Sequence, residues 1–88
     1  MKLKITELRP IITDFAKKTL DINGFRIVSV VPNESKHQWF VLIVYNADTK
    51  ISVTLNGNKE EVAMNAAKSI LLIIDDNTGD VITYSELP

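Results

Sequence analysis

HQWFVLIVY, residues 37–45, is the most apolar continuous stretch of the chain, and segments rich in turn-forming residues flank it on both sides. Side chains alternate between the two faces of a β-strand, so this stretch presents two sets. Both sets are largely apolar, with Trp39, Val41 and Ile43 on one face and Phe40, Leu42 and Val44 on the other. The β-branched and aromatic content favours a strand over a buried helix. We therefore expect an interior strand of a sheet, with another layer on each side.

An amphipathic helix is predicted before this stretch, over residues 7–20. Its apolar residues recur at helical spacing and form one stripe: Leu8, Ile11, Ile12, Phe15, Ala16 and Leu20. Thr6 is a candidate N-cap, with Pro10 within or next to the first turn; otherwise the helix begins with Pro10 as its first residue. The Asn-Gly pair at residues 23–24 supplies a stop. Residues 1–5 are expected to form a short edge strand or a frayed terminus.

Two strands are predicted around the central stretch. Residues 25–31 read as a strand and end at the turn sequence Pro-Asn-Glu-Ser, residues 32–35. Because this connection is so short, the strand and the central stretch should form an antiparallel hairpin. Residues 46–49, Asn-Ala-Asp-Thr, are expected to form the next turn. Residues 50–56 then alternate as a strand with one buried side and one solvent-facing side.

Residues 59–68 allow two interpretations. Asn58 followed by Glu61 fits an N-cap with a capping-box partner, and the segment is rich in helix formers, so we favour a second short helix. The alternative is a strand, because the Asn-Gly pair at residues 56–57 is a strong signal for a two-residue hairpin turn.

The chain closes with two further predicted strands, residues 69–75 and 80–84, joined by a turn at residues 76–79. We expect a single domain, residues 1–88, of the α+β class. The N-terminal helix should pack on one face of a mainly antiparallel sheet of about five strands. One helix covers only one face of such a sheet, so the apolar second face predicts a homodimer or a protein partner.

Charge and cysteine content exclude several classes of function. The formal net charge is -1 and the ten basic residues are scattered, so no nucleic-acid partner is expected. The chain has no cysteine, which removes disulfides, thiolate metal sites and cysteine nucleophiles, and is compatible with a cytoplasmic location. The basic N-terminal residues are not followed by the apolar segment of a signal peptide, and residues 70–74 are too short to span a bilayer. No membrane partner is therefore expected.

Candidate chemistry is sparse. His37 is the only histidine, so a metal site around it would need carboxylates as all its other ligands, and a lone histidine at a strand end is usually a surface residue. DDNTGD, residues 75–80, places Gly79 where an EF-hand loop needs an oxygen ligand, so a hairpin turn is expected instead. Glu60 and Glu61 could form an acid-base pair with these Asp residues only if the fold brought them into one pocket. The sequence therefore predicts no catalytic residue, no cofactor and no metal site.

Three aromatic residues lie in the central stretch: Trp39, Phe40 and Tyr45. A stacking platform for bases or sugars would require these rings to be exposed beside basic residues. Because they lie in the most apolar predicted strand, packing in the core is the favoured interpretation.

The closing segment ILLIIDDNTGDVITY resembles two families of small α+β proteins. In PepSY-type domains a strand ending in Asp, a turn with Thr-Gly and a following Val close the module, and Asp75, Thr78, Gly79 and Val81 match that pattern. The accessory gas vesicle protein O family is similar in having a helix, a strand with Trp and a closing strand, where Asp75, Gly79 and Tyr84 match. The sequence lacks the Arg-rich C-terminal segment of that second family. Neither resemblance implies catalytic residues.

We therefore expect a non-enzymatic protein-interaction or assembly module that uses an exposed sheet face or edge. The alternative, from a different class, is a small-molecule-binding domain or enzyme with a pocket between helix and sheet that uses His37 or the Asp cluster. A concave site with converging polar groups would favour the alternative.

Overall fold

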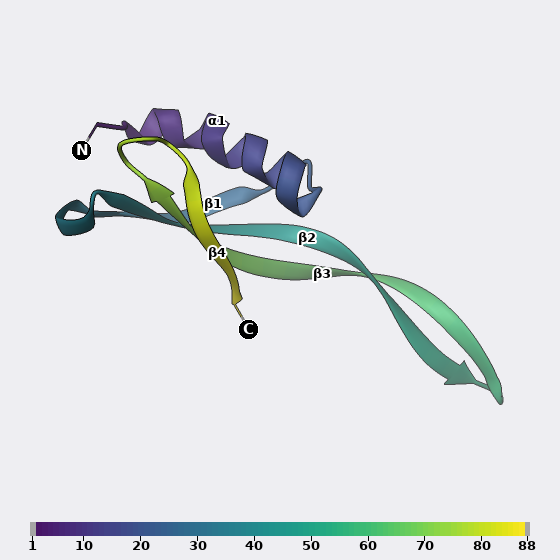
Figure 1. Cartoon of the computed structure of the whole chain (residues 1–88). Helices are drawn as coiled ribbons and strands as arrows, with labels where there is room; N and C mark the ends of the chain where they lie inside the picture. The colour runs from purple at the N-terminus through teal and green to yellow at the C-terminus, as the bar shows by residue number, and fades with distance from the viewer. Residues whose placement is uncertain (1, 88) are drawn as a thin grey trace.

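The chain folds into one helical segment and a four-stranded sheet (Figure 1). The computed structural model describes residues 2–87, apart from the side chain of Thr49. The elements in chain order are α1 (Ile5–Phe15), a π-helical turn (Ala16–Leu20), β1 (Arg26–Asn33), a 3-10 turn (Glu34–Lys36), β2 (Gln38–Leu55), β3 (Asn58–Asp75) and β4 (Val81–Leu87). Each strand pairs antiparallel with the next, in the order β1-β2-β3-β4. None of the helices in residues 2–87 is long and apolar enough to cross a bilayer.

The α+β prediction, with an N-terminal helix on an antiparallel sheet, is confirmed, but the sheet has four strands rather than about five. The turn predicted at residues 46–49 is wrong, because β2 continues through it and pairs with β3 from Gln38 to Leu55. That segment has no glycine or proline to bend the backbone, and none of its described residues has a positive φ. The strand predicted over residues 50–56 is therefore the outer part of β2.

The second short helix predicted at residues 59–68 is also wrong, and the alternative strand is observed. Asn56 and Gly57 have φ values of 52° and 81°, and a type I′ hairpin turn requires positive φ at both central residues. This turn brings the chain back alongside β2, and the ladder begins with the pair of Leu55 and Asn58. Pairing outweighs the helix preference of Lys, Glu, Ala and Met, since intrinsic propensities differ by less than about 1 kcal/mol per residue.

α1 begins earlier than predicted, whereas the helical segment ends at Leu20, as predicted. Its N-cap is Lys4 rather than Thr6, and the Glu7 carboxylate accepts a hydrogen bond of 3.2 Å from the Lys4 backbone N–H. Pro10 consequently lies inside the helix instead of in or next to its first turn. The segment stops at Asp21, whose φ of 53° is left-handed, before it reaches the predicted Asn-Gly stop.

α1 packs on one face of the sheet, and the core lies between these two layers (Figure 1). The core residues are at most 6% exposed: Leu8, Ile12, Ala16, Trp39, Val41, Ile43, Ile70, Leu72 and Ile74. β2 and β3 supply the sheet side of this core and are the two middle strands, as predicted from their apolar sequences. The prediction of core packing is thus confirmed for Trp39, whereas Phe40 lies on the opposite side of β2.

The molecule is elongated, with principal extents of 59 × 21 × 18 Å. β1 pairs with β2 only as far as Val44, and β4 pairs with β3 only from Ser69. Residues 45–68 therefore form a two-stranded ribbon, which we call the arm, that projects from the four-stranded body (Figure 1). The hydrophobic pattern of the sequence did not predict this arm.

Candidate functional site

Asp76 is the buried charged residue of the described chain, at 1% exposed. Its carboxylate accepts hydrogen bonds from Trp39 Nε1 and from the Leu3 backbone N–H, both of 2.8 Å, and from the Lys2 backbone N–H. Burial by itself raises the pKa of Asp76, but these hydrogen bonds outweigh burial and hold the pKa below its ordinary value of 3.8. All of these donors belong to the chain itself, so the carboxylate is an anchor for the N-terminal segment.

This anchor takes the place of the edge strand or frayed terminus expected for residues 1–5. Lys2 and Leu3 are held by Asp76, and Ile5 already belongs to α1, while Met1 lies outside the described residues. The Asp76 backbone N–H also donates a hydrogen bond of 2.9 Å to the His37 carbonyl oxygen. One residue thus joins the N-terminal segment to two turns at the same end of the sheet.

His37 and the DDNTGD segment form turns rather than a site. His37 is exposed and left-handed, with a φ of 54°, at the end of the 3-10 turn before β2. Asp75 Oδ1 accepts hydrogen bonds from the backbone N–H groups of Asn77 at 2.7 Å and Thr78 at 3.1 Å. Gly79 supplies the positive φ of this turn, 77°. The predicted hairpin turn is confirmed.

The two Glu residues singled out in the sequence lie far from the Asp residues of the 75–80 turn. Glu60 and Glu61 lie on the arm, some fifteen residues along the same strand from Asp75, which is a separation of about 50 Å. No group of three or more His, Asp and Glu residues in the described part of the chain could hold a metal ion. Three surface hollows, of about 510, 640 and 500 Å³, are wide open to solvent. The fold therefore does not bring Glu60 or Glu61 into one pocket with these Asp residues.

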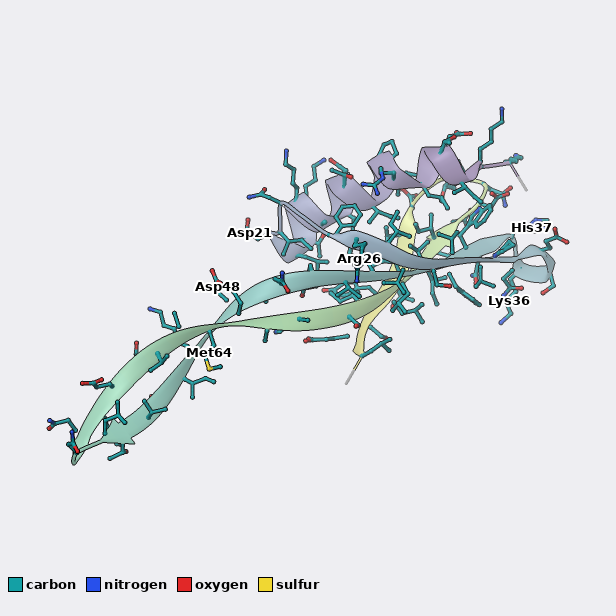
Figure 2. All side chains as sticks on the ribbon, turned by 180° about the vertical axis from the view of Figure 1, so that it is seen from behind. Asp21, Arg26, Lys36, His37, Asp48 and Met64 are labelled. Atoms are coloured by element: carbon teal, nitrogen blue, oxygen red, sulfur yellow. The ribbon has the colours of Figure 1, made fainter. Side chains whose placement is uncertain are left out.

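The sheet carries an apolar surface on the side opposite α1. Directly opposed residues in antiparallel strands share a face, and the pairs Phe40 with Ile73 and Leu42 with Leu71 lie on this side. We call six residues of this surface the open face: Val31, Phe40, Leu42, Val44, Leu71 and Ile73. Val31 is 50% exposed, and the other five are half-buried by their neighbours. Figure 2 shows side chains projecting from the sheet on the side away from α1.

Polar residues border the open face. By register, Ser29, Thr83 and Ser85 lie on the same side of the two outer strands, and Arg26 lies beside Val44. All four border residues are exposed. An apolar centre with a polar rim is the usual anatomy of a protein–protein interface, and contiguous apolar patches on a single chain mark docking sites.

The arm carries a second apolar surface. We give the name arm stripe to seven apolar residues that lie by register on one side of the ribbon: Ala47, Ile51, Val53, Leu55, Val62, Met64 and Ala66. Four of these side chains are large and between 39% and 52% exposed: Ile51, Leu55, Val62 and Met64. The opposite side is mainly polar and includes Asp48, Lys50, Ser52, Lys59 and Glu61. The arm is therefore an amphipathic ribbon with its apolar side in solvent.

No protein-family model matches the chain, and no curated protein or solved structure was found to be similar to it. The resemblances of the closing segment to PepSY-type domains and to the accessory gas vesicle protein O family therefore stay predictions. Function has to be inferred from the open face and the arm stripe.

The residues of the open face were recognisable in the sequence. The alternation of Ile51, Val53 and Leu55 was recognised too, but the expectation that this side is buried was wrong, because Ile51 and Leu55 are 42% and 52% exposed, and the half of the stripe on β3 was missed. The signal for the stripe was present beyond the Asn-Gly turn, where Val62 and Met64 alternate with Glu61 and Asn65. Helix-forming residues in the same segment obscured this period of two.

Proposed function

We propose that this chain is a non-enzymatic protein-interaction and assembly module that docks a protein through its open face. The observation that carries this proposal is an imbalance between the two sides of one sheet. In the body, β2 and β3 carry apolar residues on both sides of the sheet. α1 covers one of these two sides. When a partner removes such a surface from water, the complex is stabilised by roughly 25 cal/mol per Å² of buried apolar area.

The partner in this proposal is a second copy of the chain or another protein. Phe40, Leu42 and Leu71 at the centre of the open face offer aromatic and aliphatic side chains without a charge among them. Depletion of charge at the centre is typical of surfaces that bind proteins. The proposal includes neither nucleic acid nor a membrane as partner, and it places the module in the cytoplasm, a compartment suited to a chain without cysteines.

The alternative of a small-molecule-binding domain or enzyme requires a pocket between helix and sheet. Leu8 and Ile12 are at most 1% exposed and fill the space beneath α1. The hollow beside α1, lined by Ile11, Phe15 and Gly79 among others, has a volume of about 500 Å³ and is open to solvent. We therefore propose no catalytic residue for this chain.

A charge at the centre of the open face tests the proposal. Leu42→Lys leaves the core under α1 untouched and should weaken association at least tenfold, because the new ammonium group would have to lose its water. Thr6→Lys, on the exposed outer side of α1, is the matched control and should associate like the native chain. Sedimentation velocity measures the mass against the 9.9 kDa of one chain. Equal association by the native chain and Leu42→Lys would contradict the proposal.

A further inference from the structure

The arm lacks the support that stabilises the body. Along residues 45–68 the described strands of the arm are hydrogen-bonded only to each other, whereas the body has four paired strands and a helix. An isolated two-stranded hairpin is marginally stable in water, and independent stability requires packing against another layer. The arm stripe supplies the apolar side for such packing, and no element of the described chain lies on it. The arm stripe is therefore an apolar surface that the described part of the chain leaves exposed.

The arm twists so that its stripe turns toward the side of the open face. Alternate residues along β2 and β3 belong to one set by register, and Ile43 and Ile70 are in the same set as the arm stripe. In the body, residues of this set face α1. Figure 2 shows Met64, from the same set, pointing away from the side on which α1 lies, and Asp48, from the opposite set, pointing toward it. The ribbons of β2 and β3 also cross along the arm in both views, and their order is reversed beyond the crossing (Figures 1 and 2). The open face and the stripe near Met64 therefore share one side of the molecule.

We propose that a second copy of this chain lays its arm stripe across the open face, and that the exchange is reciprocal about a two-fold axis. This inference rests on the proposed function, because it names the partner of the open face. Two elongated copies packed antiparallel, with these sides together, place each arm over the body of the other. The same surface patch is then used by both copies, as a two-fold interface requires.

The dimensions of the two surfaces fit each other. Over residues 38–44 the body is ~23 Å long and, with four strands, ~19 Å wide, whereas the arm, over residues 45–55, is ~36 Å long and two strands, or ~10 Å, wide. Two arms on two open faces would remove on the order of 1,000 Å² from water, counting both partners, which is near the lower end for specific interfaces. In this arrangement the same contact, the arm stripe of one copy on the open face of the other, covers both apolar surfaces.

Charge distinguishes this arrangement from a pairing of arm with arm. Glu60 lies opposite Val53 on the stripe side of the ribbon and would be buried in either arrangement. Lys68, the basic residue on the same side, is already paired with Glu86 at 3.4 Å. The side of the sheet with the open face offers Arg26, so a copy bound there can supply the opposite charge that a buried carboxylate needs.

Cysteine cross-linking tests the inference without background, because the native chain has no cysteine. Leu42→Cys marks the open face and Ile51→Cys marks the arm stripe. Both changes are at side chains outside the core, and circular dichroism checks that each variant is folded. The two variants are mixed in equal amounts and oxidised with diamide, and the disulfide-linked species are separated and identified by mass spectrometry.

We expect the mixed disulfide between Cys at 42 and Cys at 51 to exceed both symmetric products at least fivefold. Predominance of the 42–42 product would overturn the arm exchange but support docking through the open face. Predominance of the 51–51 product would overturn both, because the arms would then pair with each other. Absence of cross-links, with a monomeric mass at millimolar concentration, would overturn the arm exchange and any docking of a second copy on the open face, and would leave another protein as the partner of that face.

Discussion

Trp39 Nε1 donates a hydrogen bond of 2.8 Å to Asp76 Oδ1, across 37 positions of the chain. The bond joins the central strand to the turn after β3. The same carboxylate holds the backbone of Lys2 and Leu3, immediately before α1 begins. This pair therefore anchors the start of α1 at the covered side of the sheet.

Asp76→Asn tests the anchor through its pH dependence. The pKa of Asp76 is lowered in the folded chain, so its carboxylate stabilises the fold above the ordinary value of 3.8. This contribution is lost as pH falls through the lowered pKa. We expect the native chain to resist urea better than the variant at about pH 6, and the difference to close toward about pH 2.

Urea titrations followed by the fluorescence of Trp39 measure this difference. The other acidic groups titrate in both proteins and cancel in the comparison. A difference that stays constant over the whole range would mean that the charge of Asp76 contributes nothing to the stability of the fold.

Two alanine substitutions on α1 test which side of the helix stabilises the fold. Ile12 is 0% exposed and Ile5 is 64% exposed, so the same chemical change is made in the core and in solvent. Ile12→Ala should lower the free energy of unfolding by about 2–5 kcal/mol, the usual cost of a core cavity. Ile5→Ala should change it by about 0.5 kcal/mol or less. Chemical denaturation measures both, and similar losses would contradict the placement of α1.

The arm turn depends on the left-handed backbone of Gly57, whose φ is 81°. Gly57→Ala places a Cβ on this backbone and should destabilise the hairpin by about 1–2 kcal/mol. Gly24→Ala is the matched control, because its new Cβ meets no atom within 4 Å and its φ is not left-handed. Hydrogen exchange should accelerate in residues 50–63 of Gly57→Ala only. Equal exchange in the two variants would contradict the type I′ turn.

The sequence predicted the body of this fold better than the arm, for a physical reason. Strands that are apolar on both faces have to lie in the middle of a sheet, and this constraint identified both β2 and β3. The same property predicted that a single helix would leave one side open. Hydrophobic patterning reports burial, and burial is concentrated in the body.

Few side chains of the arm are buried, so its structure had to be predicted from local propensities, and these were misleading. Asn46 and Asp48 are turn formers, yet they continue as a strand because Ala67 and Asn65 pair with them. Residues 59–68 favour a helix one by one, yet the Asn-Gly turn commits them to the ladder. Of the candidate site, the open face was therefore predictable, whereas the half of the arm stripe on β3 depended on the choice between a helix and a strand over residues 59–68.

Side-chain footprinting tests most directly whether the open face is a docking surface. Carbene labelling of the native chain, dilute and then concentrated enough to associate, reports the exposure of individual side chains. We predict that labelling of Phe40, Leu42 and Leu71 falls at least threefold on association, while labelling of Ile5, which is 64% exposed on α1, stays constant. Unchanged labelling of the open face in the associated chain, or protection of Ile5 in its place, would contradict the account.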